Sequence, residues 1–231
     1  MQIVLIILGL GLFLGLIYGP RAWVNRVFKK YSSPENLFEG TGGELAIYLL
    51  EELKIKNVTV EQTNPGQDHY DPVEKAVRLS PDIYSGKSLT AITVAAHEVG
   101  HVMQDVSGSR LFNLRLSMVR IAQVTEKMGS AAIIAMPFIG IITRSPAVSG
   151  LIFGLGIAGI AFGTLVHLIT LPVELDASFN RALPMLKSGN YISESQSTHA
   201  RVILKAAAYT YVASSLANLF NLFRWFRILR R

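Results

Sequence analysis

The chain of 231 residues contains no cysteine. Disulfide bonds and thiolate metal sites are therefore excluded, and any metal ion must be held by histidine, aspartate or glutamate. Charged residues are also scarce: they make up 16% of the sequence, compared with about 25% in a typical soluble domain. Half of the residues are hydrophobic. This balance is typical of a membrane protein.

An excess of acidic residues is also missing, and the formal net charge is +6. A nucleic-acid surface would arrange such charges in a stripe with interleaved aromatic side chains, and the sequence has no such stripe. The basic residues instead flank apolar runs, as the positive-inside rule describes for membrane proteins. We therefore expect a lipid bilayer as a partner and no nucleic acid.

The first apolar run, residues 3–19, carries no charge and is just long enough to span a membrane. A cleaved signal peptide would have a basic segment before the run, and none is present. An uncleaved transmembrane anchor over residues 1–20 is therefore predicted. The basic residues that follow it place the N-terminus outside and the next part of the chain in the cytoplasm; they are Arg21, Arg26, Lys29 and Lys30.

Two more apolar runs, residues 129–143 and 147–171, are separated by the short sequence TRSP. They predict a transmembrane hairpin whose turn lies outside, because Arg144 is the only basic residue in it. A fourth span over residues 206–223 is the alternative for the C-terminal part, but it would place four arginines outside. We prefer a helix there that packs on the cytoplasmic domain or lies at the membrane interface.

The region from residue 21 to residue 127 combines helix and strand patterns. Leucines recur on one face of residues 42–54, which predicts an amphipathic helix. Residues 58–62 and 75–80 resemble short strands, and the segment at 64–72 is rich in turn residues. These patterns predict a small α+β unit.

The stretch AITVAAHEVGHVMQDVSG (91–108) lies in a predicted helix that begins after a serine N-cap and ends at a glycine. His97 and His101 are one turn apart, so both imidazoles can point at one metal ion. Glu98 is offset by about 100° from His97 and can reach a water on that ion. This is the arrangement of H-E-x-x-H metalloproteases, in which two histidines bind zinc and the glutamate is a general base. One Zn2+ per chain is therefore expected, and Gly100 suits the close approach of another segment.

Two alternatives compete with this interpretation. The first is a buried helix without a metal, but burying two histidines and a glutamate costs several kcal/mol unless they are paired. The second is a non-catalytic membrane scaffold or adaptor with a structural zinc. Structural sites usually have four protein ligands that include cysteine. The absence of cysteine and the presence of Glu98 therefore favour an enzyme.

A catalytic zinc needs a third protein ligand, and Glu174 is the best candidate. Its carboxylate follows the third apolar run, where ionised groups are costly. Two predicted spans separate it from His101, so the chain returns to the same side of the membrane. Pro172 suits the start of a new helix. Asp176 is a rival ligand or a hydrogen-bond partner, and Asp105 could orient the imidazole of His101.

Other candidates are less specific. His69 and His199 could assist catalysis, although a surface position is commoner for a histidine. Tyr209 could donate to a developing oxyanion or simply pack in its helix. The strand within residues 76–80 is expected to expose an edge along which an extended peptide substrate lies.

These patterns together predict a mainly α membrane protein with about three transmembrane helices and a small α+β zincin-like catalytic domain. The expected activity is that of a membrane-bound zinc endopeptidase that uses metal-activated water, with Glu98 as general base and the active site on the cytoplasmic side. The predicted parts are an anchor at 1–20, a catalytic region at 21–127, a transmembrane hairpin at 128–171 and a C-terminal helical part at 172–231 that supplies the third ligand.

Three segments of the chain resemble a known family: DHYDPVEKAVRLSPDIYSGKSLTAITVAAHEVGHVMQD (68–105), LVHLITLPVELDASFNRA (165–182) and VILKAAAYTYVASSLANL (202–219). They are similar to the bacterial YugP-like zinc metallopeptidases, which are membrane proteins with an H-E-x-x-H helix. The resemblance implies a neutral zinc metallopeptidase of the bacterial plasma membrane. It assigns zinc to His97 and His101 and the catalytic carboxylate to Glu98.

A more distant likeness is to the HtpX-type membrane proteases. In those proteins an aspartate follows the ligand glutamate by four residues, whereas Ser178 stands at that position here. We expect Asp176 or Asp105 to take the role of that aspartate.

Overall fold

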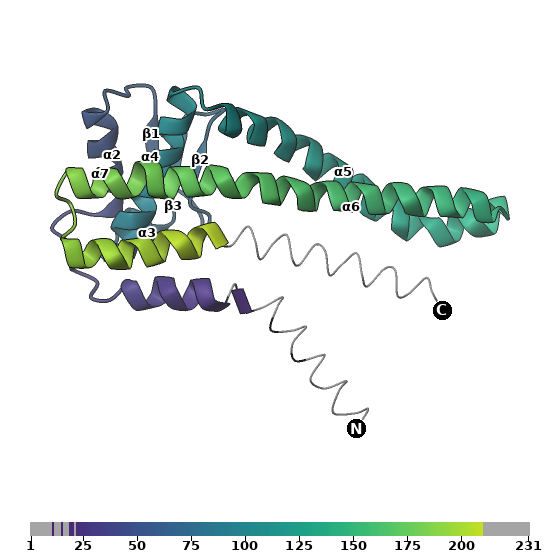
Figure 1. Ribbon diagram of the computed structural model, residues 1–231, viewed down its shortest axis with the longest axis horizontal. Coiled ribbons are helices and arrows are strands. Elements are labelled where there is room, and N and C mark those ends of the chain that lie inside the picture. The colour runs from purple at the N-terminus through teal and green to yellow at the C-terminus, as the bar shows by residue number, and fades with distance from the viewer. Residues whose placement is uncertain (1–10, 12–14, 16–18, 21, 210–231) are drawn as a thin grey trace. The chain divides into compact units, whose positions relative to one another are not determined.

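The computed structural model describes residues 22–209 and, before them, residues 11, 15, 19 and 20. Most of the predicted anchor at 3–19 and most of the predicted helix at 206–223 therefore lie outside the described residues. The described chain is mostly helical and has one small sheet, as the sequence predicts (Figure 1).

The chain divides into two compact units. One unit contains Arg21–Phe112 and Pro172–Thr210, and the other includes Asn113–Leu171. The first unit holds the sheet and the H-E-x-x-H motif, and the second holds most of the two long apolar helices.

Helix α4 (Leu89–Val106) is the centre of the first unit. The hydroxyl of Ser88 caps it by accepting a hydrogen bond from the backbone N–H of Ala91 at 3.2 Å, as predicted for its N-cap. All of its residues are buried except Met103, Asp105 and Val106. The elements around it include the sheet, α2 (Gly42–Glu52), α3 (Pro81–Tyr84), η1 (Asp176–Ala182) and α7 (Leu183–Ser188).

Helix α2 begins in a capping box. The hydroxyl of Thr41 accepts a hydrogen bond from the backbone N–H of Glu44 at 3.2 Å. The carboxylate of Glu44 accepts one from the backbone N–H of Thr41 at 2.7 Å. The amphipathic helix predicted at 42–54 is confirmed, and its buried face includes Leu45 and Leu49.

The sheet has the strand order β1 (Thr59–Gln62), β3 (Ala76–Leu79), β2 (His69–Asp71). Strand β3 pairs in parallel with β1 and antiparallel with β2. The prediction that residues 76–80 expose a strand edge is therefore wrong, because both edges of β3 are occupied by neighbouring strands.

Strand β2 lies in the segment that was predicted as a turn. Its central residue, Tyr70, is buried, and its hydroxyl donates a hydrogen bond to the carboxylate of Asp105 on α4 at 2.6 Å. Just before the strand, the carboxylate of Asp68 accepts hydrogen bonds from the backbone N–H and the hydroxyl of Ser80 at 2.7 and 2.8 Å. Tertiary contacts therefore override the turn propensity of this segment.

The second unit contains most of helices α5 (Arg110–Thr143) and α6 (Pro146–Leu175). Both are long and apolar enough to cross a membrane, α6 over Pro146–Gly163. They approach closely through glycines: a Cβ atom added to Gly129 would lie 2.7 Å from the carbonyl oxygen of Gly156. The predicted turn between the two helices is present at Arg144, whose φ is 51°.

Both helices are longer than predicted. Helix α5 begins at Arg110, well before the predicted apolar run, and residues 110–128 contain no glycine or proline that would interrupt it. It also continues through Pro137. Helix α6 continues through Pro172, so the prediction of a new helix there is wrong. A proline inside a helix costs about 3 kcal/mol, and burial of the apolar side chain of Val173 directly after it helps to offset this cost.

Two further helical segments, residues 22–31 and 194–209, lie side by side in the first unit (Figure 1). The ring centroids of Trp23 and Tyr209 are 6.1 Å apart, and those of Tyr31 and His199 are 5.0 Å apart. Because the later residue of one segment meets the earlier residue of the other, the two segments run antiparallel.

Candidate metal centre

The H-E-x-x-H residues lie in the most buried part of α4. His97, Glu98 and His101 are only 6%, 6% and 5% exposed. The imidazole centroids of His97 and His101 are 4.7 Å apart, so the one-turn spacing places both rings on one face of the helix.

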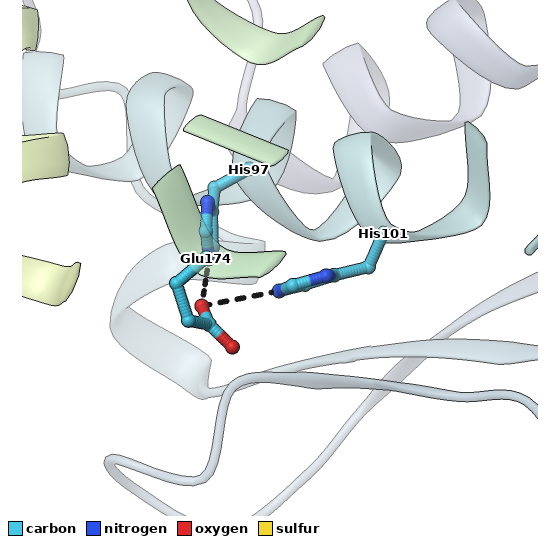
Figure 2. Close-up of side chains that lie close together, drawn as sticks. All are labelled: His97, His101 and Glu174. Atoms are coloured by element: carbon cyan, nitrogen blue, oxygen red, sulfur yellow. Dashed lines mark hydrogen bonds and ion pairs between the residues drawn. The ribbon is translucent and has the colours of Figure 1, made fainter. Parts of the chain in front are cut away.

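The carboxylate of Glu174 lies between the two imidazoles (Figure 2). Its Oε2 atom is 3.2 Å from His97 Nε2 and 3.3 Å from His101 Nε2. Glu174 is 1% exposed and belongs to the last turn of α6, in the same compact unit as α4. The structure thus brings together the three residues that the sequence proposes as metal ligands.

The spacing of these three atoms fits a metal ion. Zinc binds imidazole nitrogen and carboxylate oxygen at about 2.0–2.2 Å, so two ligands at a tetrahedral zinc lie about 3.4 Å apart. The two separations from Glu174 Oε2 are close to this value. The three ligand atoms all lie within 4.8 Å of one another. Two imidazoles and one carboxylate also match catalytic zinc sites, which keep the fourth position for water or substrate.

Gln104 determines which nitrogen of His101 carries hydrogen. The side-chain Nε2 of Gln104 donates to the carbonyl oxygen of Val173 and to Asp176 Oδ2, both at 2.8 Å. Its Oε1 atom is therefore the one that faces His101 Nδ1, at 2.9 Å, and it accepts a hydrogen bond from that nitrogen. Nε2 of His101 is left with a lone pair directed toward Glu174, as a metal ligand requires.

Ser178 has the corresponding place beside His97. Its Oγ atom lies 3.1 Å from His97 Nδ1, and the residue is fully buried. A hydroxyl can accept the Nδ1 hydrogen, which leaves His97 Nε2 available for a metal ion. Ser178, four residues after Glu174, therefore contacts the candidate metal centre itself.

Asp176 lies behind Gln104 and is not one of the three clustered ligands. It accepts hydrogen bonds from Gln104 Nε2 at 2.8 Å, Arg181 Nε at 2.9 Å and Asn180 Nδ2 at 2.9 Å. Partial burial opposes ionisation of this carboxyl, but the hydrogen bonds from Gln104, Asn180 and Arg181 outweigh it and lower its pKa. A charged Asp176 therefore holds the Gln104 amide in the orientation that serves His101.

Asp105 has other partners than the predicted His101. Its Oδ2 accepts hydrogen bonds from the hydroxyl of Tyr70 and from Lys75 Nζ, each at 2.6 Å. Burial, followed by the hydrogen bond to Asp105, raises the pKa of Tyr70. Asp105 thus joins α4 to the β2–β3 hairpin, and Gln104, one residue earlier, is the hydrogen-bond partner of His101.

Gly100 allows the π-helical element η1 to approach α4. A Cβ atom at this position would lie 2.6 Å from the carbonyl oxygen of Ala177. The close approach that the sequence predicts at Gly100 is therefore confirmed. π-Helical turns are rare and are often found at functional sites; here the turn contains Ser178 and directly follows the helix end that carries Glu174.

The remaining candidates have contacts elsewhere. His69 is exposed on β2, and its Nδ1 lies 2.7 Å from the carbonyl oxygen of Gln67. His199 is exposed and contacts Tyr31. Tyr209 is 42% exposed and contacts Trp23. The contacts found for these three residues do not link them to His97, His101 or Glu174.

Sequence reasoning missed Gln104 as a site residue. Its position three residues after His101 on the same helix face was a usable signal, because an amide at that spacing can reach back to the imidazole. Ser178 was expected to share a helix face with Glu174, four residues earlier, but it was not predicted to contact His97.

A family model described as "Putative neutral zinc metallopeptidase" matches residues 4–230. The chain belongs to this family. One relative, "Putative membrane protease YugP" of Bacillus subtilis (strain 168), is 34% identical to this chain over 216 residues. The alignment covers 93% of this chain and 92% of the relative. No solved structure matches the chain. Membership in the zinc metallopeptidase family agrees with the His97–His101–Glu174 cluster, which offers a zinc ion two imidazoles and a carboxylate.

Proposed function

We propose that the protein is a membrane-bound zinc endopeptidase of the H-E-x-x-H type. The observation that carries the proposal is the convergence of His97, His101 and Glu174 Oε2 at the spacing of a tetrahedral metal site, with Glu98 next to the first ligand. Membership in a family described as zinc metallopeptidases supports zinc as the metal and peptide hydrolysis as the reaction. Protein or peptide chains are the proposed substrates.

The residues divide the work of peptide hydrolysis. A bound zinc ion would supply a Lewis acid for the peptide carbonyl and for the attacking water. His97, His101 and Glu174 would hold it, with their geometry fixed by Gln104 and Ser178. Glu98 would accept a proton from the attacking water and pass it to the leaving amine.

An extended substrate would lie along the outer edge of β2. Strand β3 is paired on both sides, whereas β2 has β3 on one side and no second strand neighbour among the described residues. Tyr70 of β2 is tied to Asp105 of α4, so this strand lies near the helix that carries the motif. Backbone pairing at such an edge gives affinity without demanding a particular sequence.

The membrane location and the side of the active site are also proposals. Two helices are long and apolar enough to span, and the relative in Bacillus subtilis is named a membrane protease. The basic residues around 21–30 and 110–127 favour the cytoplasm for the catalytic unit.

Cleavage of casein by the full chain in detergent, with and without a zinc chelator, tests the proposal. The Glu98→Gln variant is expected to keep its zinc and lose activity by at least about 100-fold, because the amide cannot accept a proton. The Glu174→Ala variant is expected to lose zinc. Glu51→Gln, at an exposed position of α2, is the matched control and should cleave normally.

The outcomes separate an enzyme from a scaffold. Full activity in Glu98→Gln would refute the general-base role, and undiminished zinc in Glu174→Ala would refute the third ligand. A wild-type chain that holds zinc and cleaves neither casein nor membrane proteins would instead favour the non-catalytic scaffold.

A further inference from the structure

Two antiparallel helical segments, 22–31 and 194–209, form one strongly basic surface. On the first segment Arg26, Lys29 and Lys30 are exposed, and on the second Arg201 and Lys205 are exposed. We call these five cations, together with Trp23 and Tyr209, the basic face.

The spacing places these residues on adjoining stripes. Trp23, Arg26 and Lys30 follow at i, i+3 and i+7 along one helix face, and Val24 and Val27 beside this face are buried. On the second segment Arg201, Lys205 and Tyr209 follow at intervals of four. The ring contact between Trp23 and Tyr209 joins the two stripes at one end.

The charge of the basic face is not balanced within it. The segment 22–31 has no acidic residue, and 194–209 has only Glu194, which pairs with Lys187 at 2.9 Å. Within residues 22–209, the ion pairs found involve none of the five cations. Three of the cations lie over aromatic rings: Lys30 over Tyr31, Lys205 over Tyr209 and Arg201 over Phe179.

The aromatic end of the basic face adjoins apolar sequence on both segments. Trp23 follows the uncharged run at 3–19, and Tyr209 lies within the apolar stretch that begins at residue 206. Both rings are exposed, Trp23 by 38% and Tyr209 by 42%. Exposed tryptophan and tyrosine at the end of an apolar segment are typical of the membrane–water interface.

The helix rise fixes the depth of the charges. At about 1.5 Å per residue, the five cations lie about 5–12 Å beyond the aromatic pair along the helices. The headgroup layer of a bilayer is about 5–8 Å thick, and the field of its anionic lipids extends about one Debye length, near 8 Å. The cations therefore coincide with the headgroups when the two rings lie at the interface.

We propose that the basic face binds the headgroups of anionic phospholipids. This inference rests only on the membrane location within the proposed function, not on the peptidase activity. Trp23 and Tyr209 set the level of the face at the interface, and the five cations select negative headgroups over zwitterionic ones.

Fluorescence of Trp23 tests the proposal. The sequence has two tryptophans, so Trp225→Phe leaves Trp23 as the only one in the full chain. The protein is reconstituted into phosphatidylcholine vesicles that contain a minority of phosphatidylglycerol, with bromine on the acyl chains of one lipid or the other. Quenching per mole of lipid should be clearly stronger with brominated phosphatidylglycerol.

Two pairs of substitutions give a matched comparison. Arg26→Gln/Lys29→Gln removes two cations from the basic face, and Lys54→Gln/Lys56→Gln removes two exposed cations near the end of α2. The first pair should lower the preference for phosphatidylglycerol by about 5-fold per cation, or about 25-fold in all. The second pair should leave it unchanged. Arg201→Gln/Lys205→Gln provides the same test on the second segment if the first variant does not fold.

Several results would overturn the proposal. These are equal quenching by both brominated lipids, no quenching by either, and equal losses in the Lys54/Lys56 and Arg26/Lys29 variants. Displacement of phosphatidylglycerol by a short DNA duplex at about 0.15 M ionic strength would assign the face to nucleic acid instead. Extraction of the chain from membranes with alkaline carbonate tests the membrane location separately, and chelator-sensitive casein cleavage tests the peptidase activity separately.

Discussion

Gln104 gives the candidate metal centre an unusual support at the scale of a single residue. Histidine ligands usually donate their second nitrogen to a carboxylate, a backbone carbonyl or water. Here the acceptor is a buried side-chain amide, which is itself held by Asp176 and by the carbonyl oxygen of Val173. An amide fixes the tautomer of His101 without placing a second negative charge against the ring.

The Gln104→Met variant should bind zinc about 10- to 100-fold more weakly than the wild type. Methionine fills a similar volume but cannot accept the hydrogen of His101 Nδ1, so the ring is free to rotate or to change tautomer. Competition with a chelator of known affinity measures the effect.

Asp105→Asn is the control for Gln104→Met. It alters the contact of α4 with Tyr70 and Lys75 at the neighbouring position, so it should lower the melting temperature and leave the zinc affinity unchanged. A Gln104→Met protein that melts earlier but binds zinc as tightly as the wild type would show that Gln104 is only a packing residue.

The site residues differ in how far the sequence could predict them. His97, Glu98 and His101 follow from spacing alone, because i and i+4 share a helix face whatever surrounds them. Glu174 required the additional argument that two spans return the chain to one side. The partners of each imidazole could not be ranked, because Asp105 and Gln104 are neighbours on one helix and only three-dimensional packing decides which side chain reaches His101.

The contact between η1 and α4 belongs to the scale of whole elements. The Gly100→Ala variant should lose about 1–3 kcal/mol of stability, because the added methyl group would lie 2.6 Å from the carbonyl oxygen of Ala177. Zinc affinity should fall as well, because η1 carries Ser178 and follows Glu174. Thermal unfolding and chelator competition measure the two effects.

The Gly154→Ala variant provides the comparison for Gly100→Ala. Gly154 lies in α6, and a Cβ atom there would have no neighbour within 4 Å. Alanine should therefore be tolerated at this position or slightly stabilise the helix. Equal losses in both variants would mean that the close approach of η1 is not the cause.

The stability that the β2–β3 hairpin gives to the fold should depend on pH, because the carboxyl group of Asp71 titrates. The hydrogen bond from the backbone N–H of Glu74 lowers the pKa of this carboxyl most, and partial burial raises it. Hydrogen bonds from the backbone N–H of Val73 and from the Arg78 side chain lower the pKa further. Because the folded pKa lies below the unfolded value of 3.8, ionised Asp71 adds its full stability above pH 3.8 and loses it as the pH falls through the folded pKa.

Urea unfolding of the wild type and of Asp71→Asn at a series of pH values measures this contribution. The wild type should be the more stable protein near neutral pH, and the difference should vanish in strong acid. A difference that is the same near pH 2 as near pH 7 would show that ionisation of Asp71 is not responsible.

Elements with a clear local pattern were predictable, including the short strands expected within 58–62 and 75–80, which are present as β1 and β3. Elements that depend on tertiary contacts were not. The helix at 89–106 has a serine cap and a glycine shortly after its end, and the structure agrees with both signals. Strand β2 has three residues inside a turn-rich segment, and it forms because Tyr70 is buried against α4. Pro172 was predicted to start a helix, but α6 continues through it, and Val173 directly after it is buried.

The proposed topology can be tested on the whole molecule because the chain has no cysteine. Ser145→Cys in the turn between α5 and α6 should react with a membrane-impermeant maleimide from outside intact cells. Ser188→Cys, at the exposed end of α7, should react only after the membrane is opened. Labelling of both positions, or of Ser188→Cys alone, in intact cells would contradict a cytoplasmic catalytic unit.

The sequence separation within the candidate metal centre also has a consequence for the timing of synthesis. His97 and Glu174 are 77 residues apart, and α5 and most of α6 lie between them. At about 5–20 residues per second, a ribosome needs about 4–15 seconds to add this stretch. During that interval the nascent chain has both imidazoles but not the carboxylate, so a growing chain cannot become an active protease before its hairpin has been made.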